Sequence, residues 1–255
     1  MVRKLMVSAV LLLAAIVPLN AEVKYTMHME ARMAANAGND PMAQMAGPMM
    51  MQMFPAGGID QVVLAGEHGV RSEQKQAFAN MKAGMVTLIK TDGSMFMLDP
   101  SSKTYWKQPL MTSEAAGVMA GMKPDIKITK RGEFETINGM KAEHMVLSMT
   151  MALPGVDPSQ LPPGMSPDIT MGYEVWMTDA IKMPAGATNL ASTAMKQFGM
   201  GNVKELNDGR MLLKGVLTTF GVEIVMTATG FSNEAAAADL FEIPKDYKEV
   251  PSPIR

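Results

Sequence analysis

Two dipeptides that close β-hairpins lie between apolar runs, and they constrain the fold more than any other feature of the sequence. Asp92-Gly93 interrupts GMVTLIKTDGSMFMLD, and Asn138-Gly139 interrupts GEFETINGMKAEHMVLSMTMAL. Such dipeptides favour two-residue type I′ turns between antiparallel strands. Both segments are therefore predicted to be hairpins of an antiparallel sheet.

The first hairpin is apolar on both of its faces. A two-residue turn pairs Leu88 with Met97, and further apolar side chains such as Met95 stand on both sides of the strands. A sheet with one face in water should alternate between apolar and polar residues, and this hairpin does not. Helices, a second sheet or a ligand must therefore cover its second face.

Counting in steps of two along later strands gives faces made almost entirely of thioether and aliphatic groups. In DITMGYEVWMTD, for example, Trp176 lies opposite a face that carries Met171 and Met177. Methionine side chains are flexible, so such a face adapts to apolar groups of varied shape. The residues expected to line an apolar ligand site are Leu88, Met95, Met97, Met145, Leu147, Met149, Met151, Met171 and Met177.

The remaining segments complete a mainly β (α+β) pattern. A first strand begins at Glu22, two short strands fall within Ile59–Gln74, and two more meet near Phe220-Gly221. Short helices are expected at Ser113–Met122 and Pro184–Gly199. With eight to ten strands in all, the chain is predicted to form a curved antiparallel sheet, or incomplete β-barrel, with short helices covering its concave face.

Residues 1–21 have the pattern of a secretory signal peptide. Arg3 and Lys4 precede an apolar run that is too short to cross a bilayer, and cleavage is expected after Ala21. A retained N-terminal anchor is the alternative. Residues 22–255 are expected to form a single domain that is soluble in the periplasm or otherwise exported, with no integral membrane segment.

The segment from about residue 34 to residue 58 is rich in methionine and follows neither the helical nor the strand period. It is interpreted as an insertion or flexible loop, a mobile apolar flap near the mouth of a trough. The alternative is a Cu(I) site, because thioethers are soft ligands and Met49, Met51 and Met53 have M-x-M spacing. Otherwise no metal site and no cofactor is predicted.

Composition and motifs argue against several other classes of function. Without residues 1–21 the chain has 21 Lys and Arg against 25 Asp and Glu, and it has no cysteine. This weakly acidic balance of charges argues against binding to nucleic acid. His28, His68 and His144 are far apart, and no nucleophile motif occurs. We therefore expect a protein that is not an enzyme.

Five motifs occur in an order that resembles the LolA/LolB-like lipoprotein-carrier superfamily. They are VVLAGEHGVRSEQ, GSMFMLDPSSKTYW, GEFETINGMKAEH, YEVWMTDAIKMP and ADLFEIPKDYKEV. The resemblance spans about residues 22 to 250, apart from the methionine-rich segment and the proline-rich loop of residues 153–167, and it implies a single exported domain of unknown function. It also implies an incomplete barrel whose apolar concave face holds acyl chains beneath helices. Arg71 is the one residue to which the resemblance assigns a position, at the rim of the barrel. The alternative is that Arg71 forms an ordinary surface ion pair.

The preferred hypothesis is a non-enzymatic periplasmic binding or carrier domain for a lipid acyl chain or another hydrophobic small molecule. One alternative is a methionine-rich protein that buffers Cu(I). The other is a structural or interaction module of the cell envelope, with an envelope protein as its partner.

Overall fold

The computed structural model describes residues 22–35, 37–39, 41–78, 81–108, 125–152, 168–197, 203, 206, 208–234 and 237–253. The strands are β1 (Glu22–Met33), β2 (Ile59–Gly66), β3 (Gly69–Gln74), β4 (Val86–Lys90), β5 (Met95–Asp99), β6 (Thr104–Gln108), β7 (Asp125–Ile137), β8 (Met140–Ala152), β9 (Asp168–Lys182), β10 (Arg210–Thr219), β11 (Val222–Glu234) and β12 (Lys248–Glu249). The helices are η1 (Ala37–Asn39), α2 (Pro41–Met53), α4 (Ala185–Gln197) and η4 (Ala238–Phe241).

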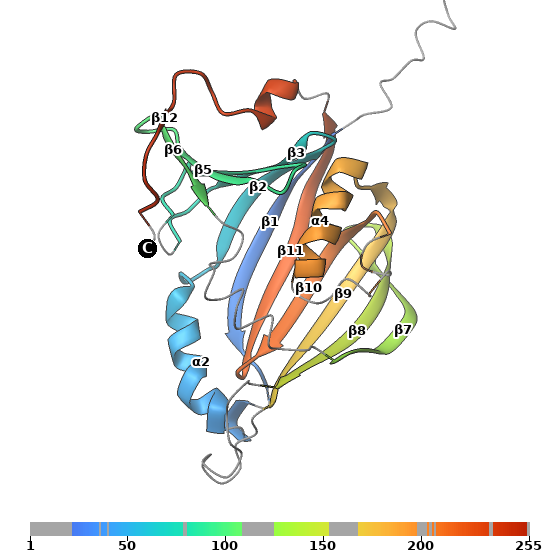
Figure 1. Ribbon diagram of the computed structural model, residues 1–255. Coiled ribbons are helices and arrows are strands. Elements are labelled where there is room, and N and C mark those ends of the chain that lie inside the picture. Colours follow the sequence, from blue (N-terminus) through green and yellow to red (C-terminus); the bar gives the residue numbers. More distant parts are fainter. Residues whose placement is uncertain are drawn as a thin grey trace, which may run out of the picture.

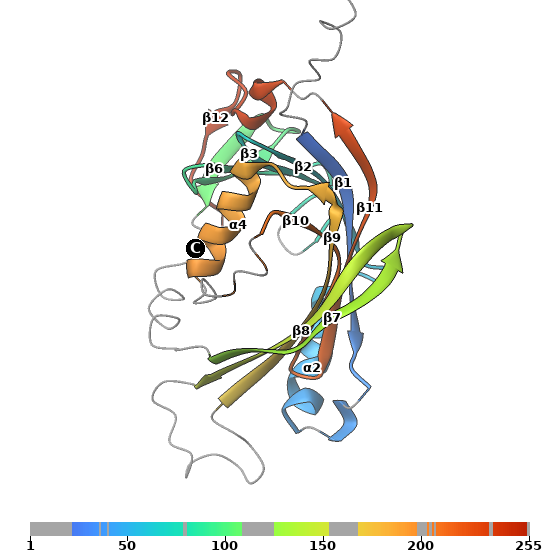
Figure 2. The same cartoon turned by 90° about the vertical axis from the view of Figure 1, so that its right-hand side faces the viewer.

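The twelve strands of the described residues form one sheet. Its order is β12-β6-β5-β4-β3-β2-β1-β11-β10-β9-β8-β7, and every pairing is antiparallel except that of β12 with β6. The sheet bends around α4, which lies on its concave face (Figures 1 and 2). The predicted curved antiparallel sheet and the predicted helix at Pro184–Gly199 are both confirmed. The predicted signal peptide and the predicted helix at Ser113–Met122 lie outside the described residues.

Two of the hairpins close with two-residue turns in which both residues have positive φ. In the β7–β8 hairpin Asn138 and Gly139 have φ values of +51° and +77°, and in the β10–β11 hairpin Phe220 and Gly221 have +48° and +69°. Positive φ at both central residues is the mark of a type I′ turn, whose twist matches that of the flanking strands. The turn predicted at Asn138-Gly139 and the strand junction predicted near Phe220-Gly221 are confirmed.

The register predicted at Asp92-Gly93 is wrong by one residue. The N–H of Lys90 donates to the carbonyl of Ser94 at 2.9 Å, so the loop contains three residues rather than two. Gly93 has φ +83° and takes the left-handed position that ends a loop of this length. Because side chains alternate along a strand, a shift of one residue moves every partner to the other face.

The shift places Leu88 and Met97 on opposite faces, and the chain itself covers both. Leu88 pairs with Phe96 and packs in a cluster with Phe241 of η4. On the other side Met97 is buried, and Met81 from the segment between β3 and β4 packs against its cluster. The prediction that both faces need a cover therefore holds for this hairpin, but the cover is protein and not a ligand.

The methionine-rich segment is not the loop that was predicted, because most of it forms α2. Alanine, methionine and glutamine have high helix propensity, although their order gives no apolar stripe. The pairing of β2 with β1 stops at Ile59 and Met29, and α2 lies beside the remaining part of β1 (Figure 1). The helix thus occupies a position where β1 has no strand partner on that side.

Gly221 lets α2 cross the tip of the β10–β11 hairpin. A Cβ atom on Gly221 would lie 2.1 Å from the Cβ atom of Ala43, which is fully buried in α2. A Cβ atom on Gly139, at the same position of the other type I′ turn, would have no neighbour within 4 Å. The two glycines therefore have the same backbone conformation in different surroundings.

This difference predicts unequal costs for the same substitution. Gly139→Ala should lower the free energy of unfolding by about 1–2 kcal/mol, which is the cost of a left-handed residue with a Cβ atom. Gly221→Ala should lower it by about 1–3 kcal/mol more, because the overlap with Ala43 forces α2 to shift. Urea unfolding of both variants measures the difference. Equal losses would show that α2 does not pack on the hairpin tip.

Candidate ligand cavity beneath helix α4

A cavity of about 220 Å³ lies between α4 and the concave face of the sheet. Its floor comes from β1, β9 and β10, and its roof from α4 and the segments on either side of that helix. The lining is mostly apolar. It consists of Tyr25, Met27, Tyr173, Val175, Met177, Met183, Thr188, Ala191, Leu206, Gly209, Arg210, Met211 and Leu212.

Ordinary strand and helix periods bring these residues together. Tyr25 and Met27 are two residues apart in β1, and side chains at that spacing share one face of a strand. The cavity residues of β9 follow the same rule. Thr188 and Ala191 are three residues apart on α4 and therefore lie on one side of the helix.

The N-terminus of α4 is fixed to the turn between β2 and β3. The carboxylate of Glu67 accepts hydrogen bonds from the N–H groups of Ala185, at 2.9 Å, and Gly186, at 3.0 Å. These are unpaired donors of a helix N-terminus, and a negative charge is favourable there. A Cβ atom on Gly186 would lie 2.1 Å from the carbonyl oxygen of Glu67, so only glycine permits this approach.

Two tyrosines line the cavity. Burial raises the pKa of Tyr25 to about 12 and also raises the pKa of Tyr173, because an apolar environment disfavours the charged phenolate. Both phenols therefore remain protonated donors at neutral pH.

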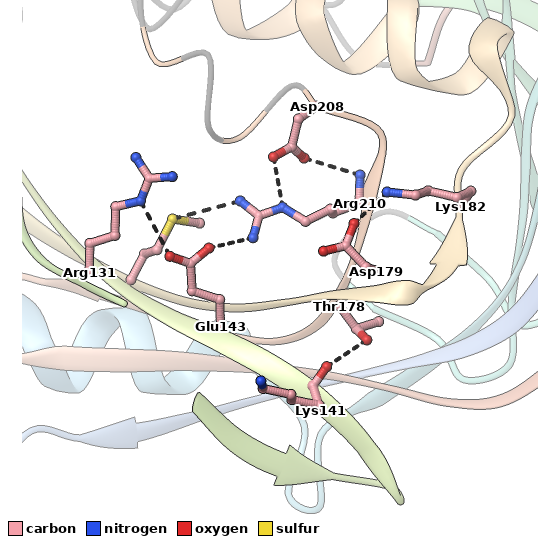
Figure 3. A network of polar contacts seen from close by, with 9 residues as sticks. Arg131, Lys141, Glu143, Thr178, Asp179, Lys182, Asp208 and Arg210 are labelled. Carbon is pink, nitrogen blue, oxygen red and sulfur yellow. Dashed lines mark hydrogen bonds and ion pairs between the residues drawn. The ribbon is translucent and has the colours of Figure 1, made fainter. Parts of the chain in front are cut away.

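Among the described residues of the cavity wall, Arg210 is the only one with a cationic side chain, and two carboxylates hold it (Figure 3). Its Nη1 lies 2.5 Å from Glu143 and its Nε lies 2.7 Å from Asp208, and its side chain is 8% exposed. Arg131 also contacts Glu143, at 3.3 Å. Burial raises the pKa of Glu143, but hydrogen bonds from Arg210 and Arg131 and their charges outweigh burial and hold it below its ordinary value.

Eight of the nine predicted lining residues lie on the face that carries the cavity, and Leu88 lies on the opposite face. Met177 alone among them lines the cavity. Met145 and Leu147 are covered by Val203 and Leu206, which belong to the segment after α4. The others lie farther along the same face, and they are Met95, Met97, Met149, Met151 and Met171. Their contact with a ligand stays a prediction.

Arg71, predicted at the rim, does not line the cavity. It pairs with Leu64 and Leu88 and therefore belongs to the face covered by η4. Its Nη1 lies 3.5 Å from the carbonyl oxygen of Leu240. Its observed contact is thus with the C-terminal segment.

Helical geometry separates Met51 from Met49, two of the three methionines named in the Cu(I) alternative. Residues two apart on a helix point about 200° away from each other, so Met49 and Met51 do not converge. Met49 shares its side of α2 with Met45, and both are 66% exposed. Among the described residues, no group of three or more His, Cys, Asp or Glu side chains has a geometry that suits a metal ion.

A second hollow, of about 290 Å³, lies beside α2. Its lining includes the carboxylate of Glu30, the thioether of Met51, the ring of Phe54 and residues 55–58. It shares no residue with the cavity beneath α4. A carboxylate without a cationic partner in the lining makes this hollow the poorer site for an acyl chain.

Sequence reasoning missed the contributions of Tyr25, Met27 and Arg210. The alternation of side chains in EVKYTMHM could have identified Tyr25 and Met27 as residues of one strand face, since that strand was predicted. The pairing of that strand with β11, more than 190 residues away, has no local signal. For Arg210 the sequence shows the nearby partner Asp208 but not Glu143, which comes from another strand.

Comparisons with known proteins give a family and a set of remote structural similarities. Residues 45–247 match the family described as "Domain of unknown function (DUF4412)". No match to a curated protein was found. In the described part of the chain, no helix is both long and apolar enough to cross a membrane.

Several solved structures are similar to this chain, and three of them illustrate the range of coverage. A LolA superfamily protein from Nitrosomonas europaea has 10% identity and a TM-score of 0.34, over 87% of this chain and 90% of that one. A putative outer membrane lipoprotein-sorting protein domain from Vibrio parahaemolyticus has 8% identity and a TM-score of 0.32, over 86% and 89%. A structure of PNGF-II has 13% identity and a TM-score of 0.38, over 89% of this chain but 31% of that one.

The first of these proteins is named for the superfamily that the five sequence motifs resemble. All three TM-scores lie below 0.5, so none of these similarities carries an argument.

The ion pair of Arg210 predicts a pH-dependent contribution to stability. Because the folded pKa of Glu143 is lowered, the pair stabilises the fold above the unfolded pKa and loses this effect as the pH falls through the folded pKa. Glu143→Gln should therefore lower the free energy of unfolding by about 3 kcal/mol at pH 7. The loss should shrink as the pH falls towards 4.

Chemical unfolding of both proteins at several pH values measures this trend. Glu223→Gln is the matched control, because Glu223 forms a more exposed pair with Arg32 at 2.8 Å. Its loss should stay below about 1 kcal/mol. A loss for Glu143→Gln that is the same at pH 7 and pH 4 contradicts the assignment.

Proposed function

The chain belongs to the DUF4412 family, whose function is unknown, and we propose that it is a non-enzymatic carrier that binds an apolar molecule beneath α4. The observation that carries the proposal is the 220 Å³ cavity with its largely apolar lining. Its setting is proposed to be the periplasm or another exported location, in accord with the signal-like pattern of residues 1–21. The ligand is proposed to be a lipid acyl chain or a comparable hydrophobic small molecule.

The size of the cavity sets the scale of binding. An engineered apolar cavity of about 150 Å³ holds benzene, so 220 Å³ suits a guest only slightly larger. Each buried methylene contributes about 0.8 kcal/mol, so six carbons contribute on the order of 5 kcal/mol before the entropy of ordering is subtracted. Binding is therefore weak and reversible, as a carrier requires.

A longer acyl chain needs more room than this cavity offers. α4 is held at its N-terminus by Glu67 and Gly186, and it covers the cavity through small side chains such as Ala191. Tilting of α4 about that N-terminal joint is the movement that would lengthen the cavity without breaking the sheet.

The methionines of the cavity give a direct test. Met27, Met177, Met183 and Met211 line it, whereas Met45 and Met49 are exposed on α2. Addition of 2-methylheptane to protein labelled with ¹³C at the methionine methyl groups should shift the first four signals and leave the last two unchanged. Shifts at none of the four, together with no lipid in an organic extract of protein purified from its native envelope, would falsify the proposal.

A blocking variant tests the position of the site. Ala191→Trp should fill the cavity from the roof and weaken binding of 2-methylheptane by about tenfold or more, since displacing two methylenes costs about 1.6 kcal/mol. Asn189→Trp is the matched control, because Asn189 is exposed on α4 and does not line the cavity. Equal affinities in the two variants would place the ligand elsewhere.

A further inference from the structure

Among the described residues that line the cavity beneath α4, Arg210 is the one that could hold an anion. Its Nη2 lies 4.0 Å from the sulfur of Met145, which is fully buried on the concave face and pairs with Val175 of the cavity floor. Guanidinium groups bind carboxylates through charge-assisted hydrogen bonds. The charged end of a fatty acid in this cavity would therefore be expected to bind Arg210.

Two carboxylates of the protein already bind this guanidinium group (Figure 3). Nη1 of Arg210 lies 2.5 Å from Glu143, and Nε lies 2.7 Å from Asp208. Arg131 contacts Glu143 in turn, at 3.3 Å. These four side chains carry two positive and two negative charges, so together they have no net charge to attract an anion. A ligand carboxylate must displace one of the two protein carboxylates or remain buried without a counter-charge, which is costly.

Asp208 is the carboxylate that a ligand could replace more easily. The side chain of Glu143 is 11% exposed and is shared with Arg131, whereas that of Asp208 is 39% exposed. Removing Glu143 would leave two cations without it, and the loss of one partner of a buried pair is strongly unfavourable. Removing Asp208 leaves Arg210 bound to Glu143.

The local turn keeps Asp208 on Arg210. Oδ1 of Asp208 accepts a hydrogen bond from the backbone N–H of Arg210 at 3.2 Å, which is the contact of an Asx-turn. Gly209, between them, has φ +79° and lines the cavity. A carboxylate only two residues away has an effective concentration of about a millimolar or more at the guanidinium group. A dilute ligand carboxylate does not displace it.

We propose that the ligand of this cavity is uncharged, and that Asp208 determines this specificity by occupying the guanidinium group of Arg210 that would otherwise bind an anion. The inference rests on the proposed carrier function, and it names the charge class of the ligand for the same site. Hydrocarbons and the neutral esters or amides of apolar chains belong to this class, whereas free fatty acids do not.

Three probes separate charge from shape. Hexanoate and hexanamide have the same pentyl chain and nearly the same planar end group, but only hexanoate is charged at pH 7, and 2-methylheptane is the hydrocarbon reference. Titrations followed through the methyl signals of Met27 and Met177 give the three affinities. The natural protein should bind hexanamide about tenfold more tightly than hexanoate, because the buried anion has no free partner.

Asp208→Asn should create affinity for the anion. Asparagine can still accept the hydrogen bond from the backbone N–H of Arg210, but it lacks the negative charge that binds Nε. Affinity for hexanoate should rise about tenfold or more, which is the range of one hydrogen bond to a charged group, and affinity for 2-methylheptane should stay the same. Asp208→Ser, whose hydroxyl group can take the same backbone hydrogen bond, is a second test. Thermal unfolding verifies that both variants are folded.

Asp179→Asn is the matched control, because it removes one negative charge nearby without releasing Arg210. Asp179 forms its ion pair with Lys182, and its side chain is 73% exposed. The hydrogen bond from Lys182 lowers the pKa of Asp179, and the charge of Arg210 adds to this effect. The two aspartates thus lie in the field of the same cation. Affinity for hexanoate should stay close to that of the natural protein in this control.

The outcomes separate the two proposals. If the natural protein binds hexanoate as tightly as hexanamide, the specificity for uncharged ligands is overturned and the carrier function stands. If neither variant at Asp208 gains affinity for hexanoate, or if the control at Asp179 gains as much, the role of Asp208 is overturned. Failure of all three probes to bind the natural protein overturns the carrier function and the specificity together.

Discussion

The need to bury both faces of one sheet governs the arrangement of the other elements. The register of β4 with β5 puts Leu88 on one face and Met97 on the other, and neither side can remain in water without a large loss of hydrophobic free energy. The C-terminal segment with Phe241 covers one face. On the other face, the region of β8 and β9 is covered by Val203 and Leu206, which follow α4.

The cavity exists because α4 covers the concave face with small side chains. The helix has the sequence AGATNLASTAMKQ, and the residues it turns towards the cavity are Thr188 and Ala191. Larger apolar residues there would fill the space and increase the stability of the fold. The joint at Glu67 and Gly186 holds the helix close to the sheet, together with the buried side chains of Ala187 and Leu190.

Local sequence patterns predict the features that depend on neighbouring residues. They fail for the features that depend on contacts with segments distant in the sequence. The faces of β8 and β9 follow from alternation alone, and Asn138-Gly139 closes its hairpin as predicted. At Asp92-Gly93 the loop is one residue longer, and the carboxylate of Asp92 accepts a hydrogen bond from the N–H of Ser94 at 2.8 Å. The dipeptide alone does not distinguish these two loops.

The formation of α2 and the lining of the cavity both depend on pairings remote in sequence. The propensity for helix is present in α2, but its reason for lying beside β1 is the early end of the β1–β2 ladder. The cavity floor likewise requires β1 to pair with β11. From the sequence, one could therefore expect an apolar concave face and several of its residues, but not the place on that face where packing is incomplete.

The chemistry of the lining suggests what such a cavity can discriminate. Met27, Met177, Met183 and Met211 supply flexible walls that adapt to guests of different shape. Tyr25 and Tyr173 are held on strands of a continuous sheet, and their rings have fewer rotatable bonds than methionine. The soft part of the wall adapts to its contents, so it distinguishes little between apolar groups of similar size.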